Sequence, residues 1–595
     1  MNIPFLSSFL HYYKVFYSYV GKKLYLLCFT ILLAGISETI GITMLLPILN
    51  YSPEGAVQSF LVKSIYQYME FLGIGISLQS LLFIILLIFF LKGVLIFIQG
   101  VLSSYIATNL VKKLRIEICE KYASMNYNYY TNSNIGYLNN VVTTETNRTV
   151  AAFNKYIDVI VSIIFIAAYL LLAFILDWST TLLSLGICSC MFVALKKLIG
   201  RSRTLSVLVS ETNAQIQSLL IQTIQNFKYL KATDSFARLY KQLFNKIDKN
   251  RKYQFKNGVI SSISLSISEP AAVFFITGLI IYQVIYKGIV ITEVFILLFF
   301  FYRTFLRVFT FQKVWQDFNA KIGGIEVLKK VSKDLHINKE KYGIYPLYCF
   351  KKNIELKKVN FAYGPKQVLS DINMVICKNS SVGIVGESGA GKTTLFDILT
   401  GLITPQSGTI WINGKNYEEL DLSSLRRKIG YVMQEPVIFN DTIANNVSFW
   451  EREGKNGETI EKISTALELS HCMEFVDNST NGIKTVIGDK GIKLSGGQRQ
   501  RVAIARELYK DPEILIFDEA TSSLDSKSEN FIRESINSMM GKQTIILIAH
   551  RLSTIKNCDY VYVLDKGRIV QQGTFDELYL NKKSHFYNMC KAQNL

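Results

Sequence analysis

Six apolar stretches, each long enough to cross a bilayer, constrain this chain more than any other feature of its sequence. They lie near residues 24–49, 80–107, 157–177, 180–199, 259–286 and 289–312. A helix needs about 20 apolar residues to cross the hydrocarbon core. Because unpaired backbone groups are costly in lipid, stretches of this kind fold as helices. The sequence therefore predicts six transmembrane helices.

The basic charge of the chain is concentrated around these apolar stretches. The 595 residues carry a net charge of +19, and residues 1–350 hold 34 Lys and Arg against 17 Asp and Glu. Basic residues follow the second, fourth and sixth stretches, which is the pattern of cytosolic flanks. We therefore expect both termini, and the polar, helix-periodic loops 108–156 and 200–258, on the cytosolic side. A nucleic-acid-binding ATPase is the least favoured hypothesis, and we expect no nucleic-acid partner.

An amphipathic pattern runs through the outer loop between the first two stretches. In VQSFLVKSIYQYMEFLG, residues 57–73, apolar residues recur at near-helical spacing. They are Val57, Leu61, Ile65, Met69 and Leu72. The pattern predicts a short helix that lies at the outer membrane interface. An ordinary loop helix packed on its neighbours is the alternative.

From Asn353 onward, short β-rich runs alternate with helical stretches. The runs are SSVGIVG, GTIWING, KIGYVMQ, EILIFDE and TIILIAH. This alternation is typical of an α/β domain with a largely parallel sheet. We place the boundary between the two halves near residue 345.

A glycine-rich loop follows the first of the buried strands. The stretch GESGAGKT fits the pattern G-x-x-x-x-G-K-[ST], with a strand before it and a helix after it. Such a loop turns successive backbone N–H groups toward phosphate oxygens, while the lysine neutralises the β and γ phosphates. The predicted nucleotide-binding residues of this loop are Gly386, Glu387, Ser388, Gly389, Ala390, Gly391, Lys392, Thr393 and Thr394. The predicted fold is thus a polytopic α-helical membrane domain with long cytoplasmic extensions (residues 1–345) and an α/β P-loop nucleotide-binding domain (residues 346–595).

Two further strands end in residues suited to phosphate chemistry. EILIFDE delivers Asp518 and Glu519 at its carboxyl end, where α/β folds bind ligands. Asp518 is a candidate Mg²⁺ ligand, and Glu519 is a candidate general base for the attacking water. The stretch IAHR presents His550, a donor able to reach a γ-phosphate.

The stretch LSGGQRQR opens a helix with Ser and two glycines, which makes a second phosphate-binding helix N-terminus. Its predicted nucleotide-binding residues are Leu494, Ser495, Gly496, Gly497 and Gln498. One nucleotide does not need two γ-phosphate sites within one domain. The second site is therefore expected to serve the nucleotide of a partner domain.

Together these motifs resemble the ATP-binding cassette transporters, and specifically the half-size exporters with six spans followed by one nucleotide domain. The resemblance implies that Tyr363 in FAYG stacks on adenine, that Gln434 in YVMQEP is a Mg²⁺ ligand beside Thr393 and Asp518, and that His550 is the switch histidine. It likewise implies that LSGGQ is the signature motif and that residues 522–525, ending in Asp525, form the D-loop. TVIGDKG resembles the exporter X-loop, with Asp489 where Glu is usual.

The family pattern also implies a partner, cofactors and a location. Two copies pair head to tail around two ATP molecules with Mg²⁺. Glu519, LSGGQ and His550 are all intact, which favours a homodimer over a heterodimer with one degraded site. The expected location is the bacterial inner membrane, with the nucleotide domain in the cytosol.

A finer resemblance is to the bacterial flippase of lipid-linked oligosaccharides used in protein glycosylation. It is carried by SETIGITMLLPIL, QNFKYLKATDS, the amphipathic outer segment and the FYR around Arg303. It implies a polyprenyl diphosphate carrying a glycan as the substrate. The alternatives are an exporter of another lipid, a peptide or a drug, and, less favoured, an ATP-gated channel or a regulatory module.

Two arginines interrupt the sixth apolar stretch. Arg303 and Arg307 are four residues apart and would share one helix face about 6 Å from each other. One hypothesis is that they face a cavity between subunits and bind a diphosphate through bidentate hydrogen bonds. The other is that they snorkel to the inner headgroups or pair with Glu38 or Glu269. Lys92, in the second stretch, fits either hypothesis.

Overall fold

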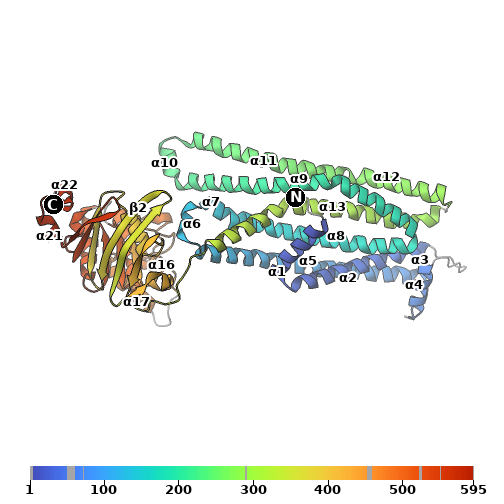
Figure 1. The fold of residues 1–595 in the computed structure, drawn as a ribbon. Helices are drawn as coiled ribbons and strands as arrows, with labels where there is room; N and C mark the ends of the chain where they lie inside the picture. Colours follow the sequence, from blue (N-terminus) through green and yellow to red (C-terminus); the bar gives the residue numbers. More distant parts are fainter. Residues whose placement is uncertain are drawn as a thin grey trace. The chain divides into compact units, whose positions relative to one another are not determined.

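The chain divides into two compact units. The computed structural model describes residues 5–49, 60–71, 73–288, 291–451, 458–520, 525–549 and 551–593. One unit comprises Met1–Met125 with Tyr129–Lys339, and the other comprises Asn126–Asn128 with Glu340–Leu595 (Figure 1). The main segment of the second unit thus begins at Glu340, close to the boundary that we place near 345.

The first unit is built from long helices (Figure 1). The helices are α1 (Phe5–Val20), α2 (Lys23–Thr43), α3 (Leu45–Leu49), α4 (Phe60–Phe71), α5 (Leu78–Ala123), α6 (Tyr127–Asn132), α7 (Ile135–Asn140), η1 (Val141–Glu145), α8 (Thr146–Leu176), α9 (Trp178–Gln225), α10 (Phe227–Ala232), α11 (Phe236–Ser266), α12 (Ser268–Ile280), η2 (Ile281–Tyr286) and α13 (Ile291–Ile337). Helix α13 packs on α8 and α9, α9 packs on α11, and α2 packs on α5 and α8. The helical loops predicted at 108–156 and 200–258 are confirmed, since α5, α9 and α11 extend far beyond the apolar stretches.

Four segments of this unit are long and apolar enough to cross a membrane, among the residues that the structure describes. They are Lys23–Thr43, Leu78–Ala123, Ile135–Ile175 and Phe236–Tyr286. The fourth and sixth predicted spans fall in α9 and α13, where the side chains of residues 187–197 and 291–297 lie outside the description. A polytopic helical membrane domain is confirmed, and the fourth and sixth spans remain predictions.

Helix α1, before the first span, has no counterpart in the sequence analysis. It buries Tyr12 and Phe16 in a cluster with α2, α8 and α13. The Phe16 ring meets Phe153 edge-on at 5.2 Å, and the Tyr12 ring meets Phe318 in the same way at 5.1 Å. These aromatic contacts fix α1 against the bundle.

The helix predicted in the loop between the first two stretches is present as α4, and the described part of it packs on its neighbours. Met69 is 3% exposed in an apolar cluster with Met44 and Leu81, and Ile65 packs against the same cluster. Tyr68 and Phe71 are exposed. Val57 and Leu72 lie outside the described residues, as does the side chain of Leu61. The packed alternative therefore describes this helix, and its apolar exposed face leaves a role at the interface open to test.

The two short outer loops are joined by polar contacts. Asp177 caps α9 by accepting from the Ser179 backbone N–H at 3.1 Å, and it forms an ion pair with Lys287 at 2.7 Å. Gln283 of η2 donates to the same carboxylate at 2.8 Å. Burial would raise the pKa of Asp177, but hydrogen bonds from Lys287, Thr180, Gln283 and Ser179 outweigh it and hold that pKa below its usual range. The loop between α8 and α9 is thus tied to the end of η2.

The second unit is an α/β domain with two sheets (Figure 1). The six-stranded sheet has the order β10-β9-β3-β8-β7-β6, and all its pairings are parallel except that of β10 with β9. The second sheet is antiparallel, with the order β2-β1-β4-β5. The strands are β1 (Asn353–Tyr363), β2 (Lys366–Cys377), β3 (Ser381–Gly386), β4 (Ser407–Ile412), β5 (Lys415–Asn416), β6 (Ile429–Val432), β7 (Ile514–Asp518), β8 (Thr544–Ile548), β9 (Tyr560–Asp565) and β10 (Arg568–Gly573).

The helices of this unit are α14 (Lys392–Leu399), α15 (Leu422–Arg426), α16 (Ile443–Ser448), α17 (Glu458–Leu469), α18 (Met473–Asp477), α19 (Gly496–Tyr509), α20 (Ser526–Met539), α21 (Phe575–Leu580) and α22 (His585–Ala592), with short 3₁₀ turns η3 (Tyr417–Glu419), η4 (Gly482–Lys484), η5 (Asp489–Gly491) and η6 (Leu552–Thr554). Some of them pack on the sheets, and others, such as α16, α17 and α19, pack on one another. All five predicted strands are present. However, GTIWING forms β4 in the antiparallel sheet rather than a strand of the parallel one.

Candidate functional site

The glycine-rich loop joins β3 to α14 at the carboxyl edge of the parallel sheet. Gly389 and Gly391 have φ angles of +83° and +102°, which L residues with side chains rarely adopt. A Cβ at Gly391 would also lie 2.8 Å from Leu369. Lys392 is only 5% exposed, and its Nζ donates to the carbonyl oxygens of Gly386 at 2.7 Å and Glu387 at 3.0 Å. The lysine therefore lies against the inner side of the loop that the sequence predicts to hold phosphates.

A cavity of about 450 Å³ opens beside this loop. Of the predicted residues, it is lined by Ser388, Gly389, Gly391, Lys392, Thr393, Thr394 and Glu519. Lys366 and Lys566 also line it, and sequence reasoning missed both. Lys566 is in the turn between β9 and β10, where the neighbouring Gly567 N–H donates to the Ala390 carbonyl at 3.1 Å. Only the tertiary fold brings this turn to the phosphate loop.

The carboxyl ends of β3 and β7 lie at one edge of the sheet, with β8 between them. Asp518 is the last residue of β7, and Glu519 follows it with a φ of +49°. The Gln434 amide donates to the Glu519 carboxylate at 2.7 Å, so the structure brings these two predicted residues together. Burial lowers the pKa of Lys392, while the charges of Glu519 and Asp518 oppose this shift. The cavity thus combines three lysines, a glycine loop and the Glu519 carboxylate, and Asp518 precedes Glu519 in the chain.

Tyr363 lies at the end of β1, near the helix that follows the loop. Its ring is partly exposed and meets Phe361 edge-on at 4.9 Å. Burial raises the pKa of Tyr363, the charge of Asp397 adds to this, and a hydrogen bond with Thr394 lowers it. Burial, with the charge of Asp518, raises the pKa of Asp397 to about 6. Tyr363 is therefore an exposed ring within reach of Thr394.

The LSGGQ stretch forms the start of α19, as predicted. Ser495 is its N-cap: the Gln498 backbone N–H donates to the Ser495 Oγ at 3.2 Å, and the Ser495 N–H donates to the Gln498 side chain at 2.8 Å. A Cβ at Gly497 would lie 2.2 Å from the Ser528 Oγ, so only glycine fits there. Asp525 caps the neighbouring helix α20 by accepting from the Ser528 N–H at 3.1 Å.

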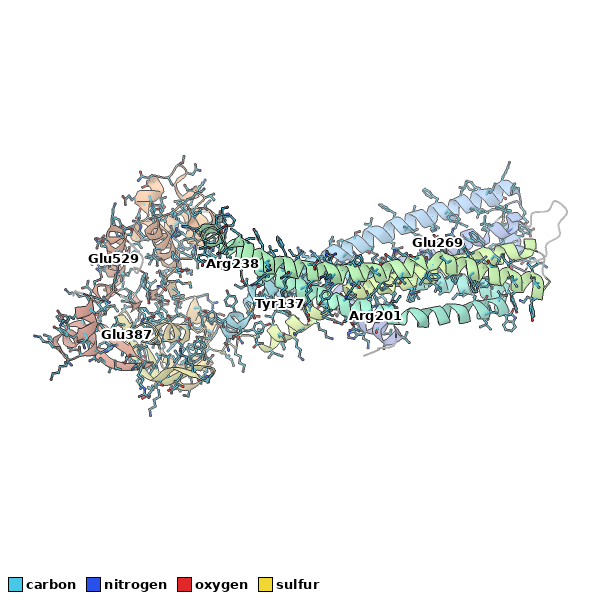
Figure 2. All side chains as sticks on the ribbon, turned by 90° about the horizontal axis from the view of Figure 1, so that it is seen from above. Tyr137, Arg201, Arg238, Glu269, Glu387 and Glu529 are labelled. Carbon is cyan, nitrogen blue, oxygen red and sulfur yellow. The ribbon has the colours of Figure 1, made fainter. Side chains whose placement is uncertain are left out.

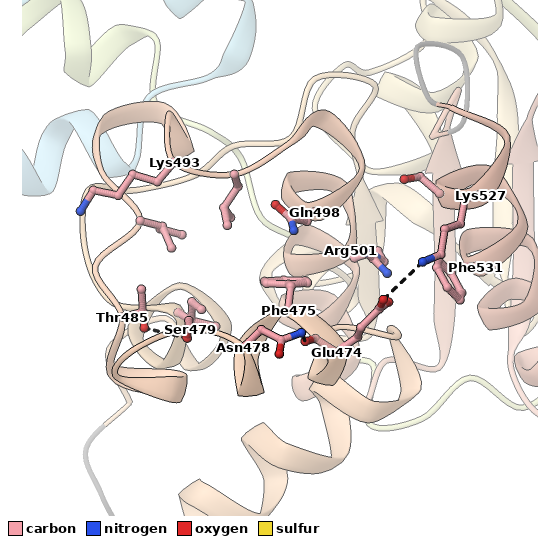
Figure 3. Close-up of a pocket in the computed structure, with 14 residues that line it drawn as sticks. Glu474, Phe475, Asn478, Ser479, Thr485, Lys493, Gln498, Arg501, Lys527 and Phe531 are labelled. Carbon is pink, nitrogen blue, oxygen red and sulfur yellow. Dashed lines mark hydrogen bonds and ion pairs between the residues drawn. The ribbon is translucent and has the colours of Figure 1, made fainter.

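A second cavity, of about 470 Å³, opens beside this helix start (Figure 3). Figure 3 shows Lys493 at the left of it, Gln498 near the middle, and Arg501 beside the Glu474–Lys527 ion pair of 3.3 Å at the right. None of the LSGGQ residues lines the cavity at the phosphate loop, within the described ranges. The arrangement agrees with two separate half-sites. His550 and residues 522–524 of the predicted D-loop lie outside the described residues.

A third candidate site lies among the membrane helices. Glu38 of α2 is 2% exposed, and three cationic side chains approach its carboxylate. Lys92 of α5 lies 3.1 Å away, and Arg303 and Arg307 of α13 lie 3.8 and 3.9 Å away. The Tyr169 hydroxyl of α8 donates to the same carboxylate at 2.5 Å. Four helices thus meet at one buried carboxylate.

The distances from Glu38 show which of the acidic partners considered in the sequence analysis the two arginines contact. Both arginines pair with Glu38 and not with Glu269, which is on α12 (Figure 2). Their side chains nevertheless remain 44% and 30% exposed. The arginines therefore have a carboxylate partner and still present guanidinium groups to the surface of this protomer, and diphosphate binding stays a prediction. Tyr169 was not predicted, since nothing local in the sequence connects it with Glu38.

Comparisons with known proteins agree with this architecture. Residues 369–522 match the family model described as ABC transporter, and residues 24–312 match that described as ABC transporter transmembrane region. The heterocyst differentiation ATP-binding protein HepA of Nostoc is 33% identical over 83% of this chain and 81% of that protein. An ATP-dependent lipid A-core flippase of Desulfotalea psychrophila is 31% identical over 88% of this chain and 91% of that protein.

A solved structure shows the same fold. It is described as a bacterial Atm1-family ABC exporter with ATP bound, and it aligns with a TM-score of 0.79 over 97% of this chain and 99% of that chain. The sequence identity is 20%, so this likeness concerns the fold alone.

Proposed function

The chain belongs to the ABC transporter family as an exporter half-transporter that couples ATP hydrolysis to transport, and from this premise we propose that it flips a polyprenyl-diphosphate-linked glycan. The proposed direction is from the inner to the outer leaflet of a bacterial inner membrane, with the nucleotide domain in the cytosol. The proposed assembly is a homodimer.

The cluster around Glu38 is the observation that carries the substrate proposal. Three cations and one carboxylate leave two positive charges among helices that the sequence predicts to cross the membrane. Separations of 3.8 and 3.9 Å are longer than hydrogen bonds, so the guanidinium N–H groups of Arg303 and Arg307 keep donor capacity for another anion. A planar guanidinium binds phosphate oxygens through paired hydrogen bonds. A lipid with a diphosphate group fits such a site.

A second candidate is an exporter of another lipid, a peptide or a drug. Several relatives bear the name ATP-dependent lipid A-core flippase, which supports a lipid as the cargo without specifying its headgroup. An anionic lipid other than the diphosphate would also use the arginines. The two candidates differ in how strongly the diphosphate itself is required.

We propose the nucleotide roles from the family resemblance together with the geometry of the first cavity. Lys392 and the loop N–H groups bind the phosphates, Tyr363 stacks on adenine, and Glu519 is the general base oriented by Gln434. Thr393, Gln434 and Asp518 fit Mg²⁺, because they offer oxygen ligands near the loop. Bound Mg²⁺ would neutralise charge on the transferred phosphate. Ser495 and its neighbours, with Asp525, act on the nucleotide held by the partner copy, and His550 is assigned to the γ-phosphate.

The test is flipping by a variant with Arg303→Ala and Arg307→Ala in reconstituted vesicles. Lys92 still lies 3.1 Å from Glu38 in that variant, so the buried carboxylate keeps a partner and the protein should fold. We expect flipping of a polyprenyl-diphosphate-linked glycan to be lost while ATP hydrolysis continues. Arg303→Lys should already impair flipping, because an ammonium group cannot bind bidentately.

The matched control is Arg251→Ala, which removes an arginine that is 65% exposed on α11. It should flip at the wild-type rate. Wild-type flipping by the double alanine variant, at equal expression and ATPase activity, would return the substrate to the second candidate.

A further inference from the structure

We propose that Lys92 and Tyr169 hold and neutralise Glu38, so that this carboxylate aligns Arg303 and Arg307 without cancelling their charge. This inference rests on the proposed function, because it concerns how the same site selects its anion. It makes Lys92 a positioning residue rather than a substrate ligand, and it makes the site selective for a dianionic headgroup.

The contacts of Glu38 fall into a close pair and a distant pair. Tyr169, which is fully buried, donates to Oε1 at 2.5 Å, and the Lys92 ammonium lies 3.1 Å from Oε2. Arg303 and Arg307 stay at 3.8 and 3.9 Å. The carboxylate is therefore fixed by the Tyr169 hydrogen bond from α8 and has the Lys92 ammonium of α5 as its closest ion-pair partner. The guanidinium groups of α13 lie farther away and, like Lys92, form no hydrogen bond with it.

Aromatic rings fix the direction from which each cation approaches. The Arg307 guanidinium lies over the Phe165 ring at 4.7 Å, and that of Arg303 lies over Phe299 at 5.5 Å. Lys92 lies 5.3 Å from the centre of the Phe89 ring. Such cation–π contacts favour one placement of the cation without using its N–H donors. The donors thus stay available for an incoming anion.

The charge balance gives Lys92 its role. Two guanidinium groups one helical turn apart repel each other, and a carboxylate beside them offsets that repulsion. A carboxylate alone would also cancel one of the two positive charges. Because Lys92 lies only 3.1 Å from Glu38, the negative charge of Glu38 is offset by the lysine. The positive charge of both arginines is then retained.

The retained charge of two fits a diphosphate diester better than a phosphate diester. A diphosphate linked at both ends carries two negative charges, whereas an ordinary phosphodiester lipid carries one. Because the membrane contains phospholipids in large excess, a site with one net charge would discriminate poorly against them. The Lys92–Glu38 pair would therefore contribute to selectivity as well as to affinity.

The experiment compares Lys92→Met, Glu38→Gln and the double variant in nanodiscs, with a polyprenyl-diphosphate-linked sugar, which is linked at both ends and carries two negative charges, as the probe. Lys92→Met leaves Glu38 to cancel one arginine, so we expect the affinity for the probe to fall about tenfold. The double variant restores the net charge, and we expect its affinity to recover to within about threefold of wild type. If Lys92 were a direct ligand, the double variant would bind no better than Lys92→Met, and the inference would be overturned.

A second measurement follows the chemical reactivity of the two arginines in the absence of any lipid. Phenylglyoxal, a neutral arginine reagent, is followed at Arg303 and Arg307 by mass spectrometry. Lys92→Met should slow their modification, because Glu38 then pairs more closely with them, and the double variant should reverse this. Equal rates in all variants would refute the positioning role even if the probe binds.

Two controls separate folding and function from the inference. Lys92→Arg keeps the charge and should resemble wild type, and Lys63→Met removes an exposed lysine of α4 and should change nothing. If wild-type protein fails to bind the probe while the modification pattern follows the expectation, the proposed substrate is wrong and the role of Lys92 stands. If the probe binds but Lys92→Met modifies at the wild-type rate, the proposed function stands and the inference fails.

Discussion

Replacing Glu519 by glutamine should separate ATP binding from ATP hydrolysis. The carboxylate lines the phosphate-loop cavity and accepts from the Gln434 amide at 2.7 Å, so an amide of the same shape keeps the local packing. What is lost is the base that accepts a proton from the attacking water. General-base catalysis contributes roughly 10²–10⁴-fold to a rate, which corresponds to about 2.7–5.4 kcal/mol. We therefore expect steady-state hydrolysis at about 1% of wild type or less.

Nucleotide binding should survive the same change. Lys392 and the glycine loop are untouched, and one negative charge is removed from the side of the cavity where phosphates are predicted to bind. The assay is phosphate release from purified protein at saturating ATP, paired with nucleotide-binding titrations. Glu534→Gln, which alters a 63% exposed carboxylate on α20, is the matched control and should hydrolyse normally. Turnover of Glu519→Gln within twofold of wild type would refute the assignment of the base.

Three further changes test other parts of the molecule. Met69→Ala should loosen the packing of α4 on its apolar cluster at a cost of about 2–5 kcal/mol, measured as faster proteolysis of this segment. If ATPase is unchanged and flipping falls, the helix serves transport. If both fall together, the helix serves folding. Ser495→Ala removes an N-cap worth about 0.5–2 kcal/mol, so thermal stability of the whole protein should change little. ATPase should nevertheless fall, because we assign Ser495 to the nucleotide held by the partner copy, and full activity would contradict that assignment. The lowered pKa of Asp177 means that its contribution to stability is present above the usual value of 3.8 and is lost only as pH falls through the lower folded value. The melting temperature of the wild type should thus stay constant between pH 8 and 5. Asp177→Asn should lower the melting temperature over that whole range, because it leaves Lys287 without an ion-pair partner. A variant as stable as wild type would show that the contact contributes nothing.

The nucleotide motifs were predictable from the sequence because each depends on neighbours in the chain. The loop before Lys392 needs glycines at fixed positions, and the capping of α19 by Ser495 needs Gln498 three residues later. Local spacing records such requirements directly. The long cytoplasmic helices were predictable for the same reason, since their periodicity is continuous.

Features that depend on tertiary contacts were not predictable in this way. Lys566 reaches the phosphate-loop cavity through a turn that follows β9, far along the chain. Tyr169 and Glu38 meet across 131 positions, and neither has a neighbour that signals the pairing. The strand β4 illustrates another limit, because an isolated β-rich run carries no information about which sheet it joins.

The contact between Asp177, Gln283 and Lys287 has a consequence for how the transporter opens to the outside. It ties the outer ends of α8 and α9 to the end of η2, next to α13 in the chain. We therefore expect α8, α9 and η2 to move as one group. An exit route on the outer side would then have to open between this group and other helices. Helices α2 and α5 pack on each other and carry no part of this contact, so we expect an outward opening to separate that pair from the tied group, at their contacts with α8 and α13. Glu38 and Lys92 are on one side of this opening, and Tyr169 and both arginines are on the other. Such an opening would pull the cationic cluster apart and weaken its hold on the anion that we propose to bind there.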